Sequence, residues 1–451
     1  MASKSMNISE GKLLPQIIKF TIPLILTNIF QQLYNIIDQM IAGKFAGEGV
    51  LAAIGATGHL TSLFINLVIG ISVGVSAVVA QTIGSGDDEV IHKSIHTSMA
   101  TSVWCGLIVG VLGIFLAKPM LLLLNTPDSI INQSTLYLAI ILGGFITSSI
   151  YNFGAAILRA TGDTKRPLLF LSISGAIKVI STFVFVVIFR WGVVAIACAT
   201  IISQLISAVL VVNALLKQPE RYRLCVKNIK IYKAELIRIL KMGVPIGLQT
   251  SMVAISNVII QASINSFGDS AIAGAAATNN INSILYSILT SMSHTSTIFC
   301  SQSFGANKPK RLLSSLYISL VLCVIVGLFS GTIFQLLSLP IIKLFVQSKE
   351  AISFALEYAS VICLTYSLSG IMETLSGGLR AINKSTLAMV SSALGLCSTR
   401  IIWVFTYFAS HRSMTVLYYS YPLSWVVTSI INLVLFIIFF RRTIKVKKEQ
   451  Q

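Results

Sequence analysis

Long apolar segments, separated by short polar connections, run along nearly the whole chain. Most are about 20 residues or longer, the length at which an α-helix crosses a bilayer. The pattern therefore predicts an all-α integral membrane protein with twelve transmembrane helices. Their expected limits are 17–42, 51–80, 97–116, 136–158, 167–189, 191–216, 239–266, 271–299, 312–337, 354–379, 387–408 and 416–440.

An internal repeat divides the chain into two halves of six spans. Gly47, Thr57, Gln81, Gly84 and Leu158-Arg159-Ala160 recur 221 residues later as Gly268, Thr278, Gln302, Gly305 and Leu379-Arg380-Ala381. Ile22-Pro23 matches Val244-Pro245 at an offset of 222 residues, so one half has gained or lost one residue between these positions and Gly47 or Gly268. We expect an N-lobe over 1–216, a basic cytoplasmic linker over 217–238, a C-lobe over 239–440 and a basic cytoplasmic tail over 441–451. Repeats that begin on the same side predict an axis along the membrane normal and a central cavity between the lobes.

The charge of the chain follows the predicted topology. Apolar residues make up 55% of the sequence and charged residues 11%, yet the formal net charge is +18. Most Lys and Arg lie in the N-terminus, the even-to-odd loops and the C-terminal tail. The opposite loops hold Lys44, Lys118, Arg190, Lys343, Lys349 and Arg412. This asymmetry predicts a multi-pass protein of the cell membrane with both termini in the cytoplasm, and it explains the charge without a nucleic-acid partner.

The first span carries a polar stripe. Asn28, Gln31, Asn35 and Asp38 fall within an arc of about 80° on a helix with 100° per residue. Because a bare carboxylate in hydrocarbon is expensive, the stripe should face a protein interior or a wet cavity. A functional site and a polar seam between helices both satisfy this requirement.

A second intramembrane charge, Lys178, lies about eleven residues into the fifth span, near the bilayer midplane. From there its side chain cannot easily reach the interface, so a partner is expected. Asp38 is the natural candidate. The alternative is that Lys178 contacts backbone carbonyls or cavity water.

The C-terminal half contains another pair of intramembrane charges, Glu373 in the tenth span and Arg400 in the eleventh. Across the short turn between these spans, we expect the two to pair, as a structural salt bridge or in a substrate or proton site. Polar side chains along spans seven and eight predict a cavity lining or interhelical hydrogen bonds. They are Gln249, Asn257, Gln261, Asn265, Asn279, Asn280, Asn282, Tyr286 and His294. His59 and His294 are candidate proton carriers.

Several segments together resemble the multidrug and toxic compound extrusion (MATE) transporters. They are IPLILTNIFQQLYNIIDQMIAG, AVVAQTIGSGD, YNFGAAILRATGDTKRP, GVPIGLQTSMVAISNVIIQASINSFG, SQSFGANKPKR and SGGLRAINKS. The ordered set covers nearly the whole chain. The resemblance implies a V-shaped antiporter of two lobes that exports organic cations against an inward flow of protons or sodium.

The resemblance also implies a cation site in the N-lobe, but this chain departs from its pattern. Asp38 matches the aspartate of helix one and Thr200 the threonine of helix six. On helix five, Lys178 and Thr182 stand where an Asn and an Asp are expected. One carboxylate and two hydroxyls make a poor cage for sodium. We therefore expect H⁺ rather than Na⁺ as the coupling ion, with Asp38, Lys178, Thr182 and Thr200 at the coupling site.

The leading hypothesis is a proton-driven antiporter for small amphipathic, cationic compounds, working by alternating access of the two lobes. The expected cavity residues are Gln31, Asn35, Gln249, Asn257, Asn282, Tyr286, Glu373 and Arg400. The alternative is an exporter of lipid-linked saccharides or of an anionic or zwitterionic metabolite. The sequence contains neither H-E-x-x-H nor G-x-x-x-x-G-K-[ST], so neither an enzyme nor a nucleotide-driven pump is expected. We expect a monomer surrounded by lipid, without cofactor or metal.

Overall fold

The computed structural model describes the backbone of residues 8–449. The side chains of Glu48, His59, Asn280, Ile444, Val446, Lys447, Lys448 and Glu449 lie outside the described part. The expectations for His59 and Asn280 therefore fall outside it.

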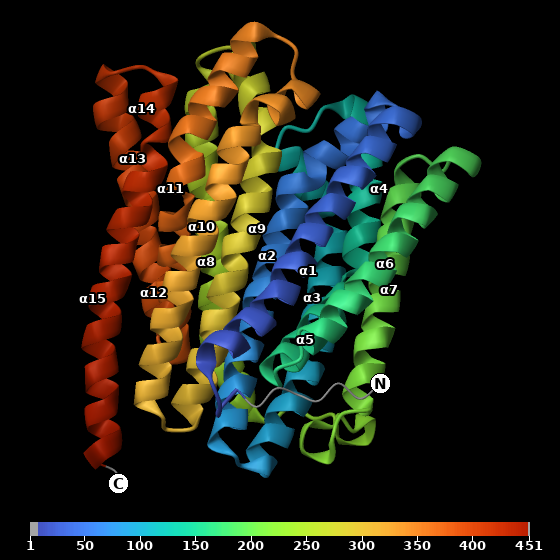
Figure 1. Ribbon diagram of the computed structural model, residues 1–451. Coiled ribbons are helices and arrows are strands. Elements are labelled where there is room, and N and C mark those ends of the chain that lie inside the picture. The colour runs from blue at the N-terminus through green and yellow to red at the C-terminus, as the bar shows by residue number, and fades with distance from the viewer. Residues whose placement is uncertain (1–7, 450–451) are drawn as a thin grey trace. The chain divides into compact units, whose positions relative to one another are not determined.

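The first half of the described chain is built from long helices (Figure 1). They are α1 (Leu13–Ile41) with the π-helical turn η1 (Ala42–Ala46), α2 (Glu48–Ser85), α3 (Asp88–Leu123), α4 (Asp128–Gly143), α5 (Phe145–Ala160), α6 (Lys165–Phe183) with η2 (Val184–Ile188), and α7 (Val193–Leu216). Two short 3₁₀ turns, η3 (Glu220–Tyr222) and η4 (Val226–Asn228), lie in the connection that follows.

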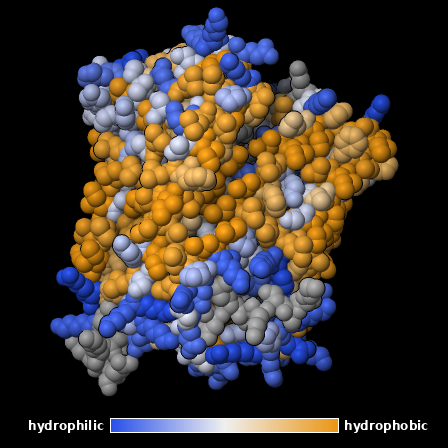
Figure 2. All heavy atoms as spheres, viewed as in Figure 1, coloured by the Kyte–Doolittle hydropathy of each residue, from blue (hydrophilic) through white to orange (hydrophobic). Residues whose placement is uncertain are grey.

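The second half repeats this arrangement. It contains α8 (Lys233–Asn265), α9 (Asp269–Gly305), α10 (Pro309–Phe345), α11 (Lys349–Ala381), and a segmented helix of α12 (Ser385–Ser392), η5 (Ala393–Ser398), α13 (Thr399–Trp403) and η6 (Val404–Phe408). α14 (Met414–Tyr418) and α15 (Ser420–Glu449) follow. Figure 2 shows apolar side chains over the middle of the helices and hydrophilic ones toward their ends.

Twelve helical spans account for the described chain, six in each half. Ten helices are long and apolar enough to cross a membrane, and α4 with α5 forms an eleventh span bent by 44°. The twelfth is α9, which is 37 residues long but too polar along its length to pass the same test. The predicted all-α, twelve-helix membrane fold is therefore confirmed, with the fourth span broken rather than straight.

Gly144 lies at the break of the fourth span. A Cβ atom at this position would lie 2.5 Å from the Cγ1 of Ile201 on α7. The absence of a side chain at Gly144 lets α7 approach the break closely.

The π-helical turn η1 accounts for the change in repeat offset. Pro23 and Gly47 are 24 residues apart, whereas Pro245 and Gly268 are 23 apart. Within this stretch α1 ends in the π turn, while α8 continues as an α-helix to Asn265. A π turn accommodates one additional residue in a helix.

The helices form two compact units. One contains Ile22–Val244, and the other combines Ile8–Thr21 with residues 245–449. In the first unit α5 packs against α2, α3 and α7; in the second, α11 packs against α9, α10 and α15. Each unit thus surrounds the helix that ends in the repeated Leu-Arg-Ala triplet.

Candidate functional site

Asp38 and Lys178 form an ion pair inside the first unit. The Nζ of Lys178 on α6 lies 2.5 Å from the Oδ2 of Asp38 on α1, and the two side chains are 14% and 10% exposed. Thr182, one turn beyond Lys178 and fully buried, donates its hydroxyl to the Oδ1 of Asp38 at 3.2 Å. The predicted pair therefore exists, and both carboxylate oxygens are engaged from the same helix.

Apolar packing surrounds this pair. A cluster that includes Ile41, Ala42, Val186 and Ile196 closes the end of α1. Tyr137 on α4 packs against the same cluster and interacts electrostatically with Asp38. In such surroundings the attraction between the charges is strong, and so is the cost of leaving one of them alone. Sequence reasoning missed Tyr137, although it is a single phenol in the apolar run LYLAIILG.

The other residues expected near Asp38 are placed differently. Thr200 on α7 donates its hydroxyl to the carbonyl of Ile196, one turn earlier, at 2.9 Å. Gln31 and Asn35 are exposed on α1. Direct contact with the carboxylate in the described structure is thus made by Lys178 and Thr182, while Gln31 and Asn35 extend the stripe as accessible amides.

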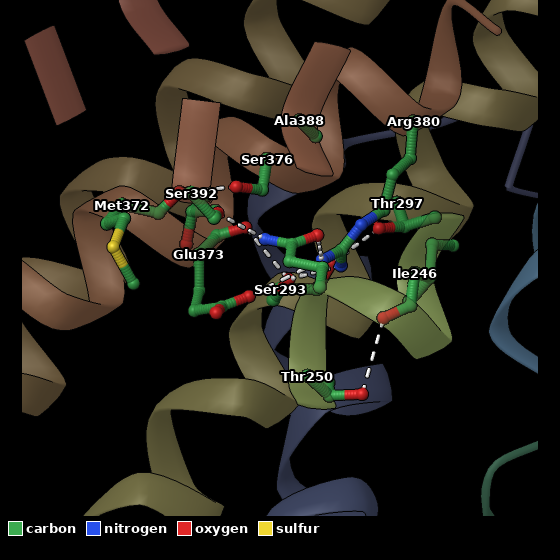
Figure 3. Close-up of polar contacts among 12 residues, drawn as sticks. Ile246, Thr250, Ser293, Thr297, Met372, Glu373, Ser376, Arg380, Ala388 and Ser392 are labelled. Carbon is green, nitrogen blue, oxygen red and sulfur yellow. Dashed lines mark hydrogen bonds and ion pairs between the residues drawn. The ribbon is translucent and has the colours of Figure 1, made fainter. Parts of the chain in front are cut away.

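Glu373 pairs with Arg380, not with Arg400, so the expected Glu373–Arg400 pair is wrong. The Nη2 of Arg380 lies 3.6 Å from the Oε2 of Glu373 and donates to the Oε1 of Gln249 at 3.0 Å (Figure 3). Its Nη1 donates to Ser293 at 3.3 Å, and that hydroxyl donates to the carbonyl of Glu373 at 2.8 Å. Glu373 and Arg380 are seven residues apart, so they lie on the same face of α11.

This Glu373 network joins four helices of the second unit. Gln249 on α8 is 2% exposed, and its amide nitrogen donates to Ser392 on α12 at 2.8 Å. The hydroxyl of Ser293 comes from α9. In the described structure the Nε of Arg380 is buried without a hydrogen-bond partner. The network is therefore nearly, but not completely, satisfied.

Asn432 fixes the neighbouring part of α11 and was missed by the sequence analysis. It is fully buried on α15, and its amide nitrogen donates to the carbonyl of Met372 at 3.2 Å and to Ser376 at 2.9 Å. Its carbonyl oxygen accepts a hydrogen bond from Ser391. A lone Asn in the apolar run IINLVLFII was the available signal, since such residues form interhelical hydrogen bonds in membranes.

Arg400 is a buried cation held by neutral groups. It is 2% exposed, and its guanidinium donates to Asn257 at 2.7 Å, Ser424 at 3.2 Å and Ser256 at 3.4 Å. The ring centroid of Tyr421 lies 4.4 Å from its Cζ. In the described part of the chain no carboxylate forms an ion pair with it.

The remaining polar candidates divide into contacts between helices and accessible groups. Asn282 on α9 accepts a hydrogen bond from the hydroxyl of Tyr366 on α11 at 2.5 Å, which supports the interhelical interpretation. Gln261 donates to Asn265 at 2.9 Å on the exposed side of α8. Tyr286 is 36% exposed and interacts electrostatically with Glu373 and Arg380. It is thus an accessible group at the edge of the Glu373 network.

Comparisons with known proteins agree with this arrangement. The MatE family model matches residues 23–184 and 245–406, two segments that begin 222 residues apart. A probable multidrug resistance protein, YpnP of Bacillus subtilis, is 24% identical over 90% of this chain and 89% of its own length. The probable multidrug resistance protein NorM of Thermotoga maritima is 22% identical over 86% of this chain and 84% of its own length.

The fold is also that of a solved structure described as the outward-facing conformation of a multidrug resistance MATE family transporter of the MOP superfamily. The TM-score is 0.89 at 18% identity, and the match covers all of both chains. Since the family model matches most of the chain, as two copies of one repeat, the protein belongs to the MatE family of multidrug efflux transporters.

Proposed function

We propose that this protein exports small amphipathic, cationic compounds in exchange for protons, by alternating access of its two lobes. The observation that carries the proposal is the ion pair of Asp38 and Lys178, supported by the hydroxyl of Thr182. This arrangement places one titratable carboxylate and one tethered cation in the interior of a membrane transporter.

The exchange follows from competition for one carboxylate. Lys178, a proton and a cationic group of the substrate can each neutralise Asp38, but they exclude one another. A proton that binds Asp38 removes the negative charge that holds a cationic substrate, so substrate and proton occupy different states. A coupling ion works only through such a difference in affinity between states.

The same geometry favours H⁺ over Na⁺. A hard cation requires several oxygen ligands at once. Around Asp38 the structure offers its own carboxylate and the hydroxyl of Thr182, while the ammonium of Lys178 occupies one carboxylate oxygen. A proton needs no such cage.

Transport in proteoliposomes tests the proposal. An inward proton gradient should drive export of a fluorescent organic cation at equal sodium on both sides. Asp38→Asn should abolish the gradient-driven component, and Lys178→Ala should reduce it while the protein remains folded. If a sodium gradient drives export at equal pH on both sides and a proton gradient does not, the assignment of the coupling ion is wrong.

Arg400 favours a second candidate, export of an anionic or zwitterionic metabolite. A buried guanidinium with neutral partners retains a full positive charge that a substrate carboxylate could neutralise. A substrate panel with matched organic cations, zwitterions and carboxylates distinguishes the two candidates. If carboxylates are exported and Arg400→Gln abolishes only their transport, the second candidate is correct.

We also propose that both termini and the 217–238 connection face the cytoplasm. The support is the concentration of Lys and Arg on that side of the predicted topology, which is the rule for cytoplasmic loops. The protein would then be a multi-pass transporter of the cell membrane.

A further inference from the structure

A basic pocket lies at the start of α3, and none of its lining residues belongs to the Asp38–Lys178 pair or to the Glu373 network. It has a volume of about 650 Å³. Its walls come from the first turns of α3 and from the connection between α7 and α8. The lining residues are Glu89, His92, Lys93, His96, Lys227, Asn228, Ile229, Lys230 and Tyr232.

Hydrogen bonds hold the connection against α3 on both sides of the lysines. The backbone N–H of Cys225 donates to the Nε2 of His96 at 3.1 Å, and the N–H of Tyr232 donates to the hydroxyl of Thr97 at 3.2 Å. The Nδ1 of His96 lies 2.7 Å from the carbonyl of His92 and therefore carries the proton. His96 is thus a neutral anchor, and the segment that carries Lys227 and Lys230 is fixed at both ends.

The pocket has an excess of positive charge. Glu89 is its one acid, and it is already paired with Lys93 on the same helix. In the described structure Lys227 and Lys230 are exposed and make neither a hydrogen bond nor an ion pair. Two ammonium groups on a fixed segment, beside the amide of Asn228 and the imidazole of His92, suit a compact anion with several oxygen acceptors.

Apolar side chains alternate with these lysines. Val226 is 61% exposed, Ile229 38% and Ile231 37%, so the segment VKNIKI presents aliphatic groups next to free ammonium groups. Such a combination is typical of segments that lie in the membrane interface, with apolar side chains among the acyl chains and lysines at the phosphates. A pocket for a soluble ligand would not require exposed aliphatic residues along the segment that carries its lysines.

We propose that this pocket binds the phosphate of an anionic phospholipid, and that Val226, Ile229 and Ile231 contact the acyl chains of the same leaflet. The lipid holds the connection between the two repeats at the membrane surface. This role is distinct from transport and independent of the identity of the transported compound.

The test uses the full-length protein in nanodiscs. Amine acylation of Lys227 and Lys230, followed by mass spectrometry, should be several-fold slower in discs with phosphatidylglycerol than in discs of phosphatidylcholine alone. Retention of phosphatidylglycerol should fall about 25-fold in Lys227→Gln/Lys230→Gln, because each lysine near a membrane surface contributes about fivefold. The control is Lys217→Gln/Lys310→Gln, which removes two exposed lysines outside the pocket and should change retention less than about twofold.

Three results would overturn the proposal. Equal acylation rates in both discs would show that no headgroup occupies the pocket. An equal loss of lipid in the control variant would show that the whole basic surface acts without a specific site. Protection by inorganic phosphate in phosphatidylcholine discs, without further protection by phosphatidylglycerol, would assign the pocket to a soluble phosphate compound instead.

Discussion

Lys178 and Asp38 join α6 to α1 through a 2.5 Å contact between Nζ and Oδ2, although the two residues are 140 positions apart. Both charges are nearly buried, so neither can be removed without affecting the other. The pair therefore stabilises the first unit as well as placing a titratable carboxylate inside it. Stability and transport must be measured separately to distinguish these roles.

Neutralising Asp38 alone should destabilise the protein. Asp38→Asn leaves the ammonium of Lys178 buried without a counter-charge, at a cost of roughly 3–5 kcal/mol. The double variant Asp38→Asn/Lys178→Met removes both charges and should recover most of this loss. Thermal unfolding in detergent measures the effect, and equal destabilisation of the single and double variants would contradict it.

Glu373 should couple energetically with Arg380 and not with Arg400. Glu373→Gln leaves the buried guanidinium of Arg380 without its carboxylate. The double variant Glu373→Gln/Arg380→Gln should therefore lose less stability than the sum of the losses in the two single variants. Glu373→Gln and Arg400→Gln should be additive within about 0.5 kcal/mol. A double-mutant cycle on unfolding measures both couplings. Strong coupling to Arg400 would show that the expected pairing forms after all.

The ring of Tyr421 should stabilise the charge of Arg400. Tyr421→Leu removes a cation–π contact worth about 2 kcal/mol in a desolvated site, in addition to the lost packing. In an Arg400→Met background the same change should cost less by about that amount. Equal costs in the two backgrounds, measured by thermal unfolding, would show that the ring only fills space.

Gly74 should be intolerant of a side chain. A Cβ there would lie 2.6 Å from the backbone of Gly243, where α2 and α8 cross within the first unit. Gly74→Ala should therefore cost about 1–3 kcal/mol. Gly58→Ala on the same helix is the matched control, since nothing lies within 4 Å of its Cβ position. Unchanged thermal stability of Gly74→Ala would contradict the close crossing.

The C-terminus should be cytoplasmic. Twelve spans with the basic loops inside place both ends of the chain on the same side. A C-terminal alkaline phosphatase fusion should therefore be inactive, and a C-terminal green fluorescent protein fusion should be fluorescent. The opposite pattern would place the C-terminus outside the cytoplasm and would contradict the proposed topology.

The class of fold and the location of the charges along the chain could both be predicted from the order of the residues. The length of each apolar segment identifies it as a span, because the rise per residue of an α-helix and the thickness of the bilayer set how many residues a crossing needs. The repeat was visible from residue identities at offsets of 221 and 222. The ion pair of Lys178 and Asp38 could also be predicted from the sequence, because a cation and a carboxylate within the membrane each need a counter-charge.

The partner of each remaining charge became apparent only in the assembled helices. The sequence makes Arg400 a plausible partner for Glu373, because a short turn joins their two helices. In the structure the partner is instead Arg380, which lies on the same face of α11, two turns from Glu373. Arg400 is satisfied by Asn257, Ser256, Ser424 and the ring of Tyr421, from two other helices. Apolar patterning fixes the length of a helix that is surrounded by hydrocarbon, but it does not fix the rotation of that helix about its axis. Packing of small residues and interhelical hydrogen bonds set that rotation, and these contacts exist only once the helices are assembled.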